Sequence, residues 1–300
     1  MADFKKHVNM TQRIFLLIIS ICLITSCYNR DKKVDKSQLI GMDYRLFQDC
    51  PAWELAKAVE DGNVKDIETQ VKERKVPVDF REERFGHTLL MMAVMNENAK
   101  SVEALLKLGA DPNAHENDGR NTPVILASGI FTKGITILKL LLDYGGDPNS
   151  EDAGLVRTDI MDFHSFALLE AASESLDKVK LLVESGADVN KTDSIYCQGA
   201  LEKSITQDKL DIALYLLQKG ADYNKKIYQN SEGGKYIDIL HQLRLNDYPL
   251  NSQQYREKMQ VVDFLKSKGL DYRNSPIPDI MYGYLQKRYP DTWQEYLKVY

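Results

Sequence analysis

The chain has 300 residues, of which 39 are lysine or arginine and 44 are aspartate or glutamate, giving a formal net charge of -5. Its 43% hydrophobic and 28% charged residues are typical of a globular protein and exclude wholesale disorder and collagen-like sequence. The mild acidity argues against a nucleic-acid binder, which usually carries a basic surplus. Four cysteines are too few for a disulfide scaffold of this length.

Residues 1–26 are expected to form a signal peptide. Basic residues in the first thirteen positions precede a short apolar run at 14–24, which is shorter than the roughly 20 residues of a membrane-spanning helix but suits a secretory signal. The segment 24–27 then reads Ile-Thr-Ser-Cys and resembles the lipobox of bacterial lipoproteins. A plain anchor helix or a buried core helix is the alternative interpretation.

The lipobox resemblance implies that Cys27 is the lipidated residue, carrying acyl chains such as palmitate that hold the protein on a bilayer. The polar segment that follows, to residue 47, is then a tether. The chain from Cys27 onward has a net charge of -7. We expect a periplasmic location, and Tyr28 after the cysteine favours the outer membrane over the inner one under the enterobacterial sorting rule.

A five-residue pattern recurs along the rest of the chain. The segment 109–113 reads Gly-Ala-Asp-Pro-Asn, and related segments begin at Gly145, Gly186, Gly220 and, in degraded form, Gly269. Apolar residues stand seven, four and three positions before each of the first four glycines, which is one face of a helix. Each glycine falls where a helix needs a left-handed residue at its C-terminus. The following Asp-x-Asn is typical of a turn.

A short helix is also expected upstream of each such helix. Thr88 and Thr122 are suitable N-caps, and Pro123 falls in a first helical turn. Together the two motifs resemble the ankyrin repeat, whose pattern is a Thr-Pro-Leu-His-x-Ala helix followed by a second helix and Gly-Ala-Asp-x-Asn. This resemblance implies an all-α fold, an ankyrin-repeat solenoid over residues 48–275. Residues 276–300 are expected to form a C-terminal helical cap.

The expected solenoid has about six units, of which the first and the last are degenerate, because terminal repeats must expose one face to water. Two spacings exceed the 33-residue period of the family. The 41-residue step after Gly145 places extra residues in 150–165, and the 49-residue step after Gly220 places them in 246–256. Such insertions are either tolerated loop drift or recognition loops, since the family carries projecting hairpins at the first of these places.

Catalytic motifs are missing from the sequence. The five histidines lack the spacing of a zinc-protease helix, and no Gly-x-Ser-x-Gly elbow or phosphate loop occurs. His87 is expected to be a structural residue at the start of a repeat. Cys50 and Cys197 are expected to be isolated thiols. We therefore expect a protein that is not an enzyme and that uses no cofactor, metal or nucleic acid.

The resemblance implies that a protein partner binds at loop tips and on the concave face of the first helices. Met92 is expected to face that groove, where a flexible apolar side chain suits partner binding. The surplus of acids favours a partner with a basic patch. The candidate partner-binding residues are His115, Glu116, Asp118, Arg120, Glu151, Asp152, Arg157, Asp159, Asp162, Phe163, Asp193, Tyr196, Met92, Glu170 and Glu174.

A lipid-anchored ankyrin-repeat protein in the periplasm resembles the immunity lipoproteins that accompany type VI secretion phospholipase toxins. That resemblance implies a non-enzymatic protein that binds and inhibits an antibacterial phospholipase acting in the periplasm. The alternative is a general periplasmic ankyrin scaffold or a stress-protective protein.

Overall fold

The structure is a computed structural model that describes residues 30–117, 119–129, 132, 134–152, 165–193, 198–229 and 235–300. Helices dominate it, and the only strands in this described part form one small hairpin. The helices are α2 (Trp53–Glu60), α3 (Val64–Glu68), α4 (Leu89–Met95), α5 (Ala99–Lys107), α6 (Pro123–Ser128), α7 (Thr136–Asp143), α8 (Ala167–Glu174), α9 (Leu176–Glu184), α10 (Ala200–Thr206), α11 (Leu210–Gln218), α12 (Ile239–Leu245), α13 (Gln253–Ser267), α14 (Asp279–Arg288) and α15 (Trp293–Val299).

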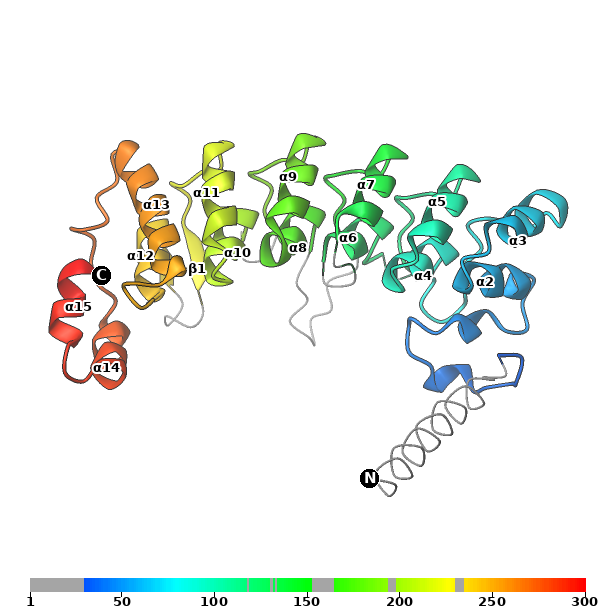
Figure 1. Cartoon of the computed structure of the whole chain (residues 1–300), viewed down its shortest axis with the longest axis horizontal. Coiled ribbons are helices and arrows are strands. Elements are labelled where there is room, and N and C mark those ends of the chain that lie inside the picture. Colours follow the sequence, from blue (N-terminus) through cyan, green and yellow to red (C-terminus); the bar gives the residue numbers. More distant parts are fainter. Residues whose placement is uncertain are drawn as a thin grey trace, which may run out of the picture.

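Helix pairs from α2–α3 to α12–α13 stand side by side in a curved row (Figure 1). Each first helix contacts the first helix of the next pair, as α4 does with α6 and α8 with α10, and α5 contacts α7 in the same way. One continuous hydrophobic core runs through the row from Tyr44 to Tyr272. This arrangement confirms the expected all-α ankyrin solenoid.

Helix starts and ends follow the chemistry expected from the sequence. The Thr88 hydroxyl accepts a hydrogen bond from Met91 N at 3.3 Å, and Thr122 does the same for Ile125 N at 3.2 Å. Pro123 is the first residue of α6. The five repeat glycines all have a left-handed backbone, with φ between +90° and +99°, so the predicted helix C-termini are confirmed.

The Asp and Asn of each turn have different tasks. The aspartate acts locally, since Asp147 Oδ1 accepts from Asn149 N at 2.8 Å. The asparagine instead joins neighbouring units: Asn149 Oδ1 accepts from Asp188 N at 2.7 Å, and its Nδ2 donates to Gly186 O at 3.1 Å. The turn asparagines therefore form a ladder between repeats, beyond the local turn role that we expected for them.

The last unit distributes its extra residues over several places. Strands β1 (Ile227–Gln229) and β2 (Lys235–Ile237) form an antiparallel hairpin before α12. The connection between α12 and α13 runs over 246–252, and α13 has 15 residues where α11 has 9. The expected loop at 246–256 is thus only partly a loop, because α13 begins at Gln253.

The N-terminal arm, residues 30–52, is packed against the first two units. It contains the short 3-10 helices η1 (Lys36–Gln38) and η2 (Tyr44–Phe47) and buries Tyr44, Leu46 and Phe47. Asp31 accepts a hydrogen bond from the indole of Trp53 at 2.8 Å. The part of the expected tether that the structure describes, 30–47, is therefore folded, because its apolar side chains join the core and its polar groups bind α2.

Helices α14 and α15 occupy the expected cap region and form a second, smaller core with Met281, Leu285, Tyr296 and Tyr300. Arg244 of α12 joins this cap to the last repeat. The residue is 2% exposed, and its guanidinium donates to the carbonyl oxygens of Tyr272, at 2.6 Å, and of Tyr300. Figure 1 shows the cap at one end of the row and the N-terminal arm at the other, both turned toward the same edge.

Candidate binding surface

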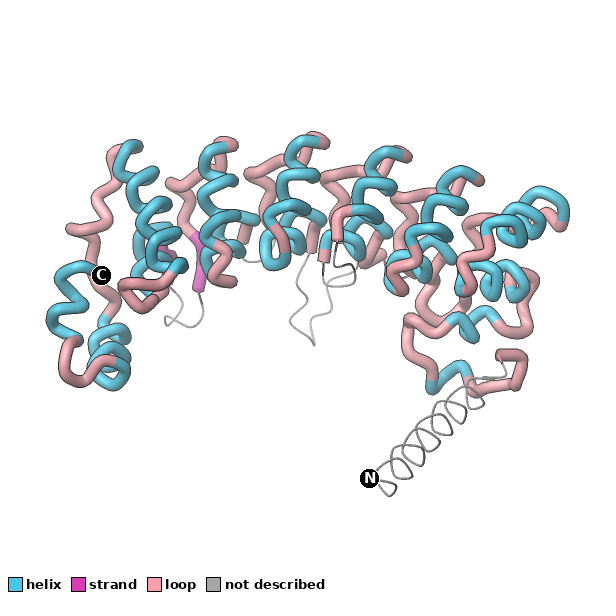
Figure 2. The backbone as a smooth tube through the Cα atoms, in the orientation of Figure 1, coloured by secondary structure: helices cyan, strands magenta, loops and turns pink. Residues whose placement is uncertain are grey.

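The stems of the inter-repeat loops line one edge of the solenoid. Antiparallel bridges join Arg81 to Thr88, Glu151 to Phe166 and Thr192 to Gly199, in each case just before a first helix begins. Figure 2 shows these stems and the β1–β2 hairpin along the lower edge, on the side toward which the N-terminal arm also projects. We call this the loop edge.

Loop residues between the second and third units are largely engaged within the protein. The Glu116 side chain is 12% exposed and contacts His87 Nε2 at 3.0 Å, and His115 Nδ1 lies 2.9 Å from Gly119 O. Burial alone would raise the pKa of Glu116, but hydrogen bonds from His87 and Asn121 outweigh it and lower that pKa. Arg120 also has a partner. These three side chains therefore make contacts within the protein that stabilise the loop, and they are not free to bind a partner.

His87 has the structural role that we expected. Its ring is stacked on Phe85 with centroids 5.2 Å apart, and its Nδ1 lies 3.0 Å from Gly41 O. Because the other ring nitrogen contacts Glu116, the histidine links the N-terminal arm to the neighbouring loop. Cys50 is a free thiol, also as expected, and its Sγ contacts Phe47 O at 3.0 Å.

The segment 150–165 carries the acids Glu151, Asp152, Asp159 and Asp162, and we call it the acidic loop. Its base is well defined. Glu151 is ion-paired with Lys191 of the next unit at 2.7 Å, and Asp152 N donates to Ser165 O at 2.7 Å. Asp193 is 7% exposed and accepts from Gln198 N at 2.6 Å, so it shapes its own loop. Several candidate residues lie outside the described residues, namely Cys27, Asp118, Arg157, Asp159, Asp162, Phe163, Tyr196 and Cys197.

The candidate residues on the first helices of the units, Met92, Glu170 and Glu174, divide into two groups. Glu170 and Glu174 of α8 are partly exposed, and Glu170 accepts a hydrogen bond from the Ser165 hydroxyl. Met92 is fully buried, so our expectation that it faces the groove is wrong. All seven residues of α4 are buried, and the N-terminal arm contacts residues at both ends of this helix: His87 Nδ1 lies 3.0 Å from Gly41 O, and Asn96 Nδ2 donates to Met42 O at 3.2 Å.

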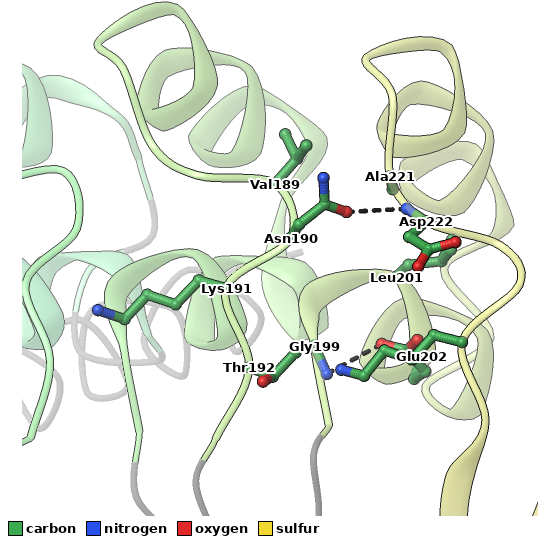
Figure 3. Close-up of a pocket in the computed structure, with 10 residues that line it drawn as sticks. Val189, Asn190, Lys191, Thr192, Gly199, Leu201, Glu202, Ala221 and Asp222 are labelled. Atoms are coloured by element: carbon green, nitrogen blue, oxygen red, sulfur yellow. Dashed lines mark hydrogen bonds between the residues drawn. The ribbon is translucent and has the colours of Figure 1, made fainter.

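A pocket of about 360 Å³ opens at the loop edge between the units of α8–α9 and α10–α11. Figure 3 shows Asn190, Lys191 and Thr192 on one wall and Asp222 and Glu202 on the other. Glu202 Oε2 accepts from Gly199 N at 2.9 Å, and burial raises the pKa of its carboxyl group.

Sequence reasoning missed this pocket, although it left one signal. Glu202 stands three residues after its N-cap, where the three preceding units place Met91, Ile125 and Leu169. A charged residue at a repeat position that is apolar in the three preceding units could have drawn attention to this unit.

Other kinds of site find no support in the described part of the chain. No group of three His, Cys, Asp or Glu side chains there could hold a metal ion. No helix among those residues is long and apolar enough to cross a membrane. The geometry is that of an extended, polar contact surface.

Comparison with known families agrees with this geometry. A family model described as "Ankyrin repeats (3 copies)" matches residues 55–152 and 132–227, which together make up more than half of the chain. The chain therefore belongs to the ankyrin-repeat family, whose repeats serve as protein–protein interaction scaffolds and whose members are generally non-enzymatic.

Similar proteins come from several sources. A putative ankyrin repeat-containing protein of Treponema pallidum is 34% identical over 98 residues, or 33% of this chain and 32% of the relative. Protein PhlB of Serratia liquefaciens is 33% identical over 120 residues, or 39% and 49%. A putative ankyrin repeat protein of fowlpox virus is 27% identical over 193 residues, or 64% and 40%. The chain thus spans a third to a half of the length of these relatives.

Proposed function

We propose that this protein is a lipid-anchored periplasmic inhibitor, an immunity protein that binds an antibacterial phospholipase toxin and blocks its access to lipid. The scaffold role comes from the ankyrin repeats. The lipid anchor comes from the lipobox-like segment ending at Cys27, and the kind of partner comes from the resemblance to type VI immunity lipoproteins.

The position of the N-terminal arm is the observation that carries this proposal. The described chain begins at Arg30, which is ion-paired with Glu60 and Asp61 at the end of α2. Figure 1 draws this dark-blue arm on the side of the loop edge. Three residues reach at most about 11 Å, so an acylated Cys27 would hold the bilayer on that same side.

A partner at the loop edge would then lie between the solenoid and the lipid surface. A phospholipase has to work at that surface, so a scaffold anchored in this orientation can meet it where it acts. The general periplasmic scaffold remains the second candidate, and it requires the same anchor but no inhibition.

Inhibition of a purified enzyme separates these two candidates. The full chain, in a non-ionic detergent, is mixed with the phospholipase encoded by the neighbouring gene, and hydrolysis of phospholipid vesicles is followed. Stoichiometric loss of hydrolysis is expected. Full hydrolysis in the presence of excess protein, or no lipase beside this gene, would remove the immunity proposal and leave the scaffold.

The anchor has its own test. Cys27→Ser should release the protein from bacterial membranes into the soluble periplasmic fraction, whereas Cys50→Ser, as the matched control, should leave it on the membrane. Membrane attachment of both variants would refute lipidation at Cys27.

The acidic loop is tested separately. Charge reversal of Asp159 and Asp162 should weaken binding of the phospholipase, and an unchanged affinity would exclude the acidic loop from the contact.

A further inference from the structure

Lys225 lies in the pocket at the loop edge and has an unusual environment. Its Nζ is buried and has no hydrogen-bond partner among the residues that the structure describes. An ammonium group can donate three hydrogen bonds, and leaving a buried charged group without acceptors is costly. The pocket beside it holds about 360 Å³, which is ample space for a small acceptor group.

The preceding repeat shows what is missing. Asn149 and Asn190 occupy equivalent places, since each accepts a hydrogen bond from the turn aspartate of the next unit, Asp188 and Asp222. Lys191 and Lys225 each stand three residues after that aspartate. Lys191 and Lys225 are therefore the same residue type at the same position of successive repeats.

Lys191 has acceptors that Lys225 lacks. Its Nζ is ion-paired with Glu151 Oε2 at 2.7 Å and donates to Asn149 O at 3.2 Å. The residue equivalent to Glu151 in the next unit is Thr192. Each stands two positions after its ladder asparagine, and each bridges to the residue that precedes the next helix, Phe166 or Gly199. The carboxylate that neutralises the first lysine is thus replaced by a hydroxyl for the second.

We propose that this pocket binds a carboxylate group, supplied by an aspartate or glutamate side chain of a partner protein, which accepts hydrogen bonds from Lys225 in the place that Glu151 takes against Lys191. The site rests on the scaffold role of the repeats and not on the identity of the partner. A free small carboxylate has the same chemistry and is separated from a side chain by the experiment.

Two acids of the protein itself line the pocket and have to be considered. Asp222 is exposed, and its carboxylate accepts a hydrogen bond from Asn224 N at 2.9 Å. Glu202 is 7% exposed, and its Oε2 accepts a hydrogen bond from Gly199 N at 2.9 Å. Its charge and that of Lys225 attract each other, but no hydrogen bond joins the two side chains. Glu202 still repels an incoming carboxylate when it is ionised, so Glu202→Gln should strengthen binding while its amide oxygen continues to accept from Gly199 N.

Glycine amides give a direct readout of the pocket. The full chain is labelled with 15N-glycine in a non-ionic detergent and titrated with acetate, with a blocked peptide that carries one glutamate, and with its glutamine counterpart. Gly199 lies in the pocket, and Gly145 serves as a distant reference. We expect a saturable shift of the Gly199 signal with acetate and with the glutamate peptide, and none with the glutamine peptide or with chloride.

Variants then assign the effect to the lysine. Lys225→Met should weaken acetate binding about tenfold or more, as expected for loss of a charged hydrogen bond, and Lys225→Arg should retain it. Lys226→Met, which removes an exposed neighbouring charge, is the matched control and should bind as the wild type does. Thr192→Glu restores the acid found in the preceding repeat and should abolish acetate binding, because the new carboxylate would form an ion pair with Lys225.

The outcomes are distinct from those for the toxin. The absence of a saturable shift in the wild type, or equal binding by Lys225→Met and Lys226→Met, would overturn the site even if the phospholipase is inhibited. Acetate binding without a response to the glutamate peptide would overturn the partner side chain as the source. Failure to inhibit any phospholipase would leave this titration unaffected.

Discussion

The asparagine ladder makes a sharp prediction about coupling between repeats. Asn149 makes two hydrogen bonds to the next unit, at 2.7 Å to Asp188 N and 3.1 Å to Gly186 O. A net contribution of about 0.5–1.5 kcal/mol for each bond, taken toward the low end because these side chains are exposed, gives about 1–2 kcal/mol for Asn149→Ala. For a domain of this size that corresponds to a fall in melting temperature of roughly 2–8 °C.

Urea unfolding followed by circular dichroism measures this loss, and hydrogen exchange at the Asp188 amide locates it. Asn224→Ala is the matched control. Asn224 holds the same place in its own turn and receives the same local bond, from its backbone N to Asp222 Oδ1, but no hydrogen bond joins its side chain to the following unit within the described chain. Equal losses for the two variants, or unchanged exchange at Asp188, would refute the role of the ladder.

Other substitutions test the ends and the middle of the array. Lys178 is 1% exposed and its Nζ donates to Gly129 O at 2.6 Å, so Lys178→Met should cost about 2–4 kcal/mol in urea unfolding. Burial lowers the pKa of the Lys178 amine in the folded protein. Between this lowered pKa and the unfolded pKa of about 10.4, the unfolded chain keeps a proton that the folded chain has lost, so the free energy of unfolding should rise with pH in that range. The Lys178→Met variant should lack this rise. Lys75 has φ +61° where other units have glycine, so Lys75→Gly should raise the free energy of unfolding by about 1 kcal/mol. Gly186→Ala, at φ +99°, should lower it by about the same amount, and the melting temperatures of the two variants should move in opposite directions. Arg244→Met should release the C-terminal cap, which limited proteolysis would detect as cleavage before α14; an intact cap would contradict its dependence on this guanidinium.

The sequence predicted the parts of this fold that depend on local chemistry. A left-handed residue is needed wherever a second helix ends, and Gly109 or Gly186 supplies it regardless of what lies nearby. Thr122 and Pro123 likewise start α6 through groups within one turn. Such features are repeated along the chain, so their register could be read from the spacing alone.

The candidate surface could be predicted only in outline, because it depends on contacts between units. Glu116 has the sequence position of an acid at a loop tip, but its carboxylate contacts His87, which lies 29 positions earlier in the chain. Met92 had the pattern of a groove residue, but every residue of α4 is buried, and the N-terminal arm, which belongs to no repeat, contacts the end of that helix at Asn96. The exposure of a repeat residue is set by its neighbour units, and a single-unit pattern does not contain that information.

The two ends of the array restrict where a partner can bind. At the N-terminal end the arm contacts α2, where the Trp53 indole donates to Asp31 at 2.8 Å, and the end of α4, where Asn96 Nδ2 donates to Met42 O at 3.2 Å. At the other end Lys258, 1% exposed, lies 4.2 Å from the Tyr300 ring centre, and α14 and α15 adjoin the last unit. Segments that belong to no repeat therefore adjoin the array at both of its ends. The loop edge between these ends, from α6 to the β1–β2 hairpin, is therefore the surface on which partner contacts should be sought, and it contains both the acidic loop and the Lys225 pocket.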